Sequence, residues 1–97
     1  MLRYFFLGFV RIHILHHAAD EPIYGSGIKE ELARHGYDLS PGTLYPILHG
    51  LEGQGYLESY DEVVNGKARK YYRTTHAGKA ALQEVKEKIA ELVKEVL

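Results

Sequence analysis

The sequence has no cysteine, and this absence excludes several kinds of site at once. Disulfides, thiolate metal ligands and cysteine nucleophiles are all ruled out. The apolar run near the N-terminus, Tyr4–Val10, falls far short of the ~20 residues that a membrane-spanning helix needs. It also lacks the small-residue cleavage pattern of a secretory signal. We therefore expect a cytoplasmic protein without a membrane partner.

An excess of charge of either sign is also missing. The chain has 12 basic and 13 acidic residues, for a net charge of −1 at pH 7. Tight non-specific binding to polyanions is not expected from this balance, so the local distribution of charge matters more. The segment Val63–His76 holds basic residues and no acidic one, and an acidic group just precedes it: Glu58, Asp61 and Glu62. A basic arm on a near-neutral protein favours a weak or moderate phosphate binder.

Motifs of enzymes are absent as well. The chain offers no carboxylate pair with a pocket, no glycine-rich phosphate loop and no nucleophile motif. We therefore predict that the protein is not an enzyme and that it carries no cofactor. Its 97 residues, 45% of them hydrophobic, suffice for one folded domain with a modest core.

The first predicted helix, about residues 2–18, is apolar nearly all round. Such a helix must be buried on several sides. A chain of 97 residues can hardly surround it with its own core, so a second subunit is the economical explanation. Pro22 cannot continue this helix.

A second helix is predicted over residues 25–34, where Ile28 and Leu32 are four positions apart.

A short third helix is predicted to begin at Pro41. Ser40 suits the N-cap, and a proline suits the first helical position because its missing N–H has no partner there in any case. Leu44, Leu48 and Leu51 form one stripe that should face the core. The side chains largely outside this stripe are Thr43, Tyr45, Pro46 and His49. The internal proline should kink or loosen the helix.

Two strand-like segments, about residues 56–63 and 68–74, flank Asn65-Gly66. This dipeptide is the strongest short-range signal for a β-hairpin. Alternation along the second strand places Arg69, Tyr71 and Arg73 on one face and Lys70 and Tyr72 on the other. We expect one of the two adjacent tyrosines to lie in the core, and only one face of the hairpin to meet a partner.

A last helix, about residues 77–97, follows Thr75, which can cap it. Its apolar residues alternate between spacings of 3 and 4 and form a coiled-coil seam: Leu82, Val85, Ile89, Leu92 and Val96. The helix is too short to hold a coiled coil alone, so we expect it to pack on other helices such as the first. A seam of this kind is either intramolecular core or a dimer contact, and the apolar first helix favours the dimer.

These elements predict a mainly α fold with a small β-hairpin (α+β), arranged as a winged helix-turn-helix. The pattern resembles the PadR family of bacterial and archaeal transcriptional regulators over about residues 14–82. The most specific segment of the resemblance is Ser40-Pro41-Gly42-Thr43-Leu44-Tyr45-Pro46, and it is supported by Pro22-Ile23-Tyr24-Gly25 and by Arg69-Lys70-Tyr71-Tyr72-Arg73 with Thr75 and Gly78. One departure is Gly25-Ser26-Gly27-Ile28, where the family usually has Gly-Tyr-Glu-Ile.

The resemblance implies a homodimer built by the first and last helices. It divides a single winged-helix domain, residues 1–97, into a DNA-binding core over 1–76 and a dimerisation helix over 77–97. The expected interface residues are Phe5, Phe6, Phe9, Leu82, Val85, Ile89, Leu92 and Val96. The resemblance also implies transcriptional repression that is relieved by a small, often aromatic, effector.

Contacts with double-stranded DNA are expected from the third helix and the hairpin. The helix N-terminus and the Ser40 hydroxyl can donate to a phosphate. Thr43 and Tyr45 can reach a phosphate or a base edge, Thr43 or Pro46 can touch a thymine methyl, and His49 lies one turn further on. The hairpin adds Lys67, Arg69, Lys70 and Arg73. Because the helix tip has neither arginine nor asparagine, we expect phosphate positioning and shape readout to matter much.

Several of these residues have a structural alternative. Tyr45 can be a packing residue, and Lys67 and Lys70 can be solvated hairpin charges. His13, His16 and His17 share one helix and could bind a divalent metal with Asp20, or could make dimer stability pH-dependent. Polar surface is the commoner role for such histidines, so no metal site is predicted.

For the whole protein, the alternative is a winged-helix module for protein–protein contact, in which the basic hairpin is dispensable.

Overall fold

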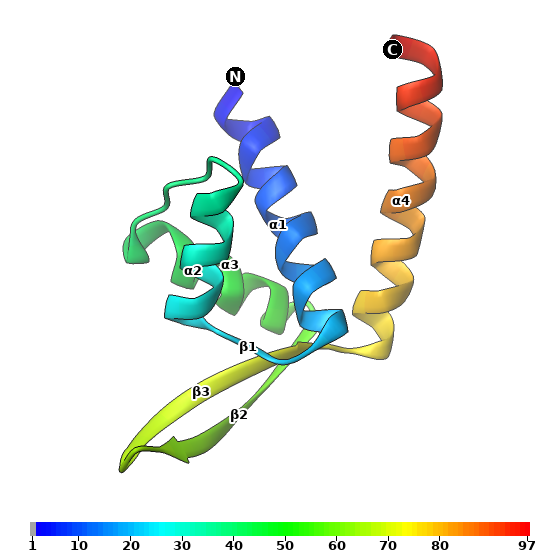
Figure 1. Ribbon diagram of the computed structural model, residues 1–97. Coiled ribbons are helices and arrows are strands. Elements are labelled where there is room, and N and C mark those ends of the chain that lie inside the picture. The colour runs from blue at the N-terminus through cyan, green and yellow to red at the C-terminus, as the bar shows by residue number, and fades with distance from the viewer. Residues whose placement is uncertain (1) are drawn as a thin grey trace.

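The computed structural model of the protein describes residues 2–97, which form four helices and one three-stranded antiparallel sheet (Figure 1). The elements in chain order are α1 (Leu2–Asp20), β1 (Ile23–Tyr24), α2 (Gly25–Arg34), α3 (Pro41–Gly53), β2 (Leu57–Val64), β3 (Lys67–Thr74) and α4 (His76–Val96). The predicted α+β fold is confirmed, and each boundary predicted above lies within two residues of the observed one. None of the helices in the described part combines the length and hydrophobicity needed to cross a membrane.

The sheet has the strand order β1-β3-β2, and β1 is the element that the sequence does not predict. This strand has two residues, too few for any alternation of polar and apolar side chains to be visible. Ile23 pairs with Tyr72 and Tyr24 pairs with Tyr71, both on β3. The pairing fixes the chain between α1 and α2 to the base of the hairpin.

The hairpin turn is the one that the Asn-Gly dipeptide predicts. Asn65 and Gly66 both have positive φ, +52° and +78°, as a type I′ turn requires. Val64 and Lys67 pair directly across it, and the register continues to Leu57 opposite Thr74. The tight turn therefore sets which residues of β2 and β3 face each other.

The core lies where α1, α2, α3 and the sheet meet. Its most buried side chains come from α1, α2, α3 and the sheet: Val10, Ile14, Ile28, Leu32, Leu44, Leu48, Leu57 and Tyr72. Tyr72 is thus the tyrosine that enters the core, and burial raises the pKa of its phenol. The buried Thr74 hydroxyl donates to the Leu15 carbonyl at 2.8 Å and ties β3 to α1.

The two predicted helix caps differ in their chemistry. The Thr75 side chain accepts a hydrogen bond from the Gly78 N–H at 3.0 Å, as predicted. Ser40 occupies the N-cap of α3, but its hydroxyl makes no cap bond and instead donates to the Thr43 hydroxyl at 3.3 Å. The reason is that the Ser40 carbonyl already accepts from the Thr43 N–H, at 3.0 Å. The helix continues through Pro46, so this proline does not end it.

Helices α1 and α4 meet near the sheet and diverge toward the two termini (Figure 1). Leu82 is only 5% exposed because it packs in the chain's own core, so it belongs to the core and is not available as an interface residue. The rest of the α4 seam is more open, and Leu92 and Val96 are 58% and 63% exposed. Three aromatic residues near the start of α1 are also exposed: Phe5, Phe6 and Phe9.

Candidate nucleic-acid interface

A groove of about 600 Å³ lies between α3, the start of α2 and the hairpin. Five of the nine residues predicted to contact DNA line it: Tyr45, His49, Lys67, Arg69 and Lys70. The other four lie outside it: Ser40, Thr43, Pro46 and Arg73. The fold therefore brings a phenol, an imidazole and three cationic side chains to one concave surface.

The faces of α3 divide as the sequence predicts. Leu44, Leu48 and Leu51 are buried, together with Ile47 beside them. The opposite face is open to solvent, with Ser40, Tyr45, Pro46 and His49 exposed and Thr43 half-buried. The Tyr45 and His49 rings lie 6.4 Å apart, one turn from each other. This face can enter a groove of DNA without disturbing the core.

Two glycines at the start of α2 make room for tyrosines, and the sequence does not reveal this role. A Cβ on Gly25 would lie 2.8 Å from Cζ of Tyr45 and closer still to its hydroxyl oxygen. A Cβ on Gly27 would lie 2.9 Å from Cζ of Tyr24. Tyr45 is therefore partly a packing residue, although 41% of it is exposed. The sequence did contain one indication of this role. Two glycines stand at the start of a helix, where almost any other residue would form the helix better.

The hairpin register places acidic residues directly opposite basic ones. Glu58 faces Arg73, Asp61 faces Lys70, and Glu62 faces Arg69. Arg73 Nε donates to Glu58 Oε1 at 2.6 Å, so the charge of Arg73 is already paired. In the sequence, the acidic group and the basic arm look separate; antiparallel pairing folds one onto the other. The hairpin is therefore less positive than the sequence suggests.

Aromatic rings and cations form a continuous stack on the face that carries Arg69, Tyr71 and Arg73. The Arg69 guanidinium lies 4.1 Å from the centre of the Tyr24 ring. Tyr24 meets Tyr71 edge to face, and Tyr71 stacks on Tyr60, each pair at 5.6 Å between ring centres. The Arg73 guanidinium completes the stack, 5.4 Å from the Tyr60 ring. A guanidinium held by its flat face keeps its N–H donors free at the edge, so Arg69 is positioned to donate outward.

Comparison with known proteins gives one consistent match. The sequence model of the Transcriptional regulator PadR-like family matches residues 14–84. The chain is 57% identical over 88 residues to Transcriptional regulator Rv3488 of Mycobacterium tuberculosis, covering 91% of this chain and 82% of that protein.

Solved structures agree as well. A PadR family transcriptional regulator from Eggerthella lenta is 36% identical and superposes with a TM-score of 0.86, over 99% of this chain and 85% of that one. A PadR-like transcriptional regulator from Bacillus cereus is 28% identical, with a TM-score of 0.83, over 92% of this chain and 88% of that one.

Proposed function

Because the chain belongs to the PadR-like family of transcriptional regulators, we propose that it is a sequence-specific repressor that binds DNA as a homodimer. Its family and the relatives named above are transcriptional regulators, and the chain is not an enzyme. The observation that carries the proposal is the groove that brings Tyr45, His49 and the basic residues of the hairpin together. Because such regulators act on chromosomal DNA, the proposed location is the cytoplasm.

In the proposed complex, α3 enters the major groove of the DNA, and the hairpin lies along the neighbouring sugar–phosphate backbone. Tyr45 and His49 face base edges or phosphates, and Pro46 is placed for a thymine methyl. The α3 N-terminus, with the Ser40 and Thr43 hydroxyls, favours a phosphate because of its partial positive charge. On the hairpin, the proposed phosphate contacts are Lys67, Arg69 and Lys70. Arg69 and Lys70 alternate along β3, but both line the groove, so the expectation that only one face of the hairpin meets a partner is not kept here. We leave Arg73 out because Glu58 neutralises it.

The proposed dimer uses the exposed apolar residues of α1 and α4. On α1 these are Phe5, Phe6 and Phe9, and on α4 they are Ile89, Leu92 and Val96, next to the half-buried Val85. In this arrangement residues 1–76 bind DNA and residues 77–97 hold the two copies together. A two-fold dimer should recognise two half-sites spaced by roughly 10 base pairs or a multiple. Relief of repression by a small aromatic effector is proposed on the family resemblance alone.

A salt series tests the DNA contacts against the protein–protein alternative. Fluorescence anisotropy on promoter DNA should give an affinity that falls steeply with salt, because several phosphates release counterions on binding. Lys70→Ala should flatten the slope of log affinity against log salt by about one unit. Arg73→Ala is the matched control and should leave the slope near that of the wild type, because Glu58 already pairs this charge.

Two outcomes would count against the proposal that the protein binds DNA. The first is an affinity without salt dependence that Tyr45→Ala also leaves unchanged. The second is a variant without hairpin charges that still binds its target while a protein partner co-purifies, as the protein–protein module predicts.

Gly25→Ala tests whether the position of Tyr45 matters for binding. The added methyl should push the end of the Tyr45 side chain away from α2, because the two would otherwise overlap. We expect DNA affinity to fall at least about fivefold, with a change in stability below about 1 kcal/mol, since an exposed side chain can swing aside. Anisotropy and thermal melts measure the two effects. Gly53→Ala, where no atom lies within 4 Å, is the control and should bind normally. Unchanged affinity in Gly25→Ala would show that Tyr45 is only a packing residue.

A further inference from the structure

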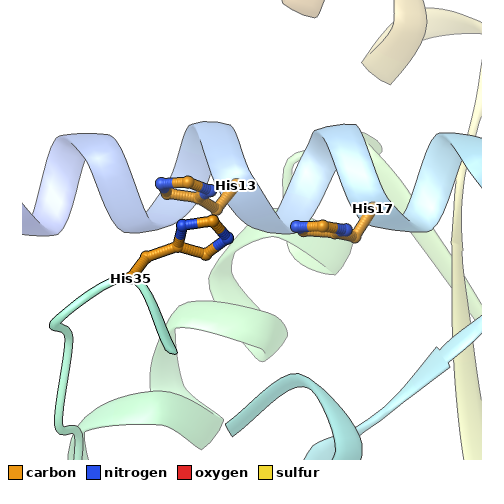
Figure 2. A group of neighbouring side chains, drawn as sticks. All are labelled: His13, His17 and His35. Atoms are coloured by element: carbon orange, nitrogen blue, oxygen red, sulfur yellow. The ribbon is translucent and has the colours of Figure 1, made fainter. Parts of the chain in front are cut away.

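Three histidines outside the proposed DNA contact come together between α1 and the end of α2. His13 and His17 lie one turn apart on α1, and His35 follows α2 as its C-cap residue (Figure 2). One ligand nitrogen from each lies within 4.8 Å of the other two. The His13 and His35 rings stack with 4.5 Å between their centres.

This group differs from the one that the sequence suggests. Helical spacing on α1 groups His13 and His17 with His16, but His16 is exposed and lies outside the cluster. Its place is taken by His35, which is 18 residues further along the chain than His17. The third ligand therefore comes from a different helix, and the group links two elements instead of decorating one.

A carboxylate faces the same group. Glu31 Oε1 lies 3.6 Å from Nε2 of His17 and 3.5 Å from Nε2 of His35. The other oxygen, Oε2, accepts a hydrogen bond from Arg34 Nη1 at 2.5 Å. Arg34 thus fixes the carboxylate so that one oxygen points toward the histidines. Asp20, the carboxylate that helical spacing suggests, is not a member of the cluster.

We propose that His13, His17 and His35 bind a divalent transition-metal ion such as Zn²⁺, with Glu31 as the fourth ligand. Imidazole nitrogens suit Zn²⁺, Cu²⁺, Ni²⁺ and Co²⁺, whereas Mg²⁺ and Ca²⁺ require oxygen ligands. Tetrahedral zinc with Zn–N bonds of about 2.0–2.1 Å needs its ligand nitrogens roughly 3.3 Å apart. The present nitrogens lie within 4.8 Å of one another, so metal binding requires the imidazole rings to rotate until their nitrogens converge on the ion.

The surroundings favour metal entry and the ligating form of the imidazole. Burial lowers the pKa of His13, and the neighbouring His35 and His17 lower it further, so its neutral form is favoured. His17 and Glu31 also line a cavity of about 300 Å³ between α1 and α2, which offers a route from solvent. A bound ion would fasten the end of α2 to α1, just before the turn that leads to α3.

The test uses the full chain without any histidine tag, metal-free at the start. Co²⁺ should give visible d–d absorption with the intensity of a tetrahedral site, and excess Zn²⁺ should abolish it. Isothermal titration should show one Zn²⁺ bound per chain and no binding of Mg²⁺. His35→Asn should weaken Zn²⁺ binding at least tenfold, and Glu31→Gln should weaken it severalfold. His16→Asn is the matched control and should bind as the wild type does.

Circular dichroism of each metal-free variant confirms that the fold is kept, which is expected because His35 and Glu31 are not in the core. The proposal fails if the wild type gives no tetrahedral Co²⁺ spectrum, if His35→Asn or Glu31→Gln binds Zn²⁺ like the wild type, or if His16→Asn loses as much affinity as His35→Asn. None of these measurements needs DNA, so their failure leaves the proposed function untouched.

Discussion

Leu92→Asp is expected to convert the proposed dimer to a monomer and to lower its affinity for a two-half-site DNA at least a hundredfold. Leu92 is 58% exposed in the single chain, so the change should leave the protomer fold intact. In a two-fold interface the substitution occurs twice, and each copy buries an unpaired carboxylate at a cost of several kcal/mol. Two linked half-sites bind roughly 10²–10⁴ times more tightly than one, and a monomer loses this gain.

Sedimentation velocity and anisotropy on the same samples measure the two effects. Gln83→Asp is the matched control, because it adds the same charge to an exposed position of α4 outside the apolar seam. It should remain dimeric and bind DNA normally. If Leu92→Asp still sediments like the wild type, α4 is not the dimer contact; a wild-type monomer would refute the dimer altogether.

Gly78→Ala should lower the free energy of unfolding by about 3 kcal/mol, a typical cost of overpacking a buried site. At a solvent-exposed position inside a helix, the same change would raise the free energy of unfolding by up to about 1 kcal/mol. Here the new Cβ would lie 2.6 Å from Cγ2 of Thr74 and closer still to the carbonyl oxygen of Tyr56. That carbonyl cannot easily move away, because it accepts the Thr75 N–H at 3.0 Å.

Urea unfolding at a fixed protein concentration measures this effect, with the concentration fixed because dimerisation would contribute to stability. Gly50→Ala is the control. It lies inside α3 with no atom within 4 Å of the added methyl, so it should be neutral or stabilising. A Gly78→Ala protein as stable as the wild type would show that the junction between the hairpin and α4 can relax.

The parts of the fold that could be predicted are those with local signals. Apolar spacing marks the helices, Thr75 marks the start of α4, and Asn65-Gly66 marks the turn. These signals depend on residues only a few positions apart. Such residues contact one another within a single helix or turn, so their spacing in the sequence is enough to predict the element. The α3 face with Tyr45 and His49 was predictable for the same reason.

The parts that could not be predicted depend on pairing between distant residues. β1 exists only because β3 lies beside it, and its Tyr24 then supports Arg69 from 45 positions away. Arg73 reads as a free cation until the hairpin register places Glu58 opposite it. His35 has no histidine within helical reach in the sequence, and only the packing of α2 on α1 brings it to His13. Such contacts follow from the tertiary structure and not from periodicity.

The near balance of charge on the hairpin has a consequence for the protein's search for its target. A chromosome offers about 10⁶–10⁹ competing non-specific sites, and a strongly basic wing would leave most copies of a regulator resting on them. With Glu58, Asp61 and Glu62 set opposite the cations, each such encounter is weakened. In the proposed function, a larger share of the copies would then stay free to find the operator, so that a small number of molecules per cell would suffice to occupy it.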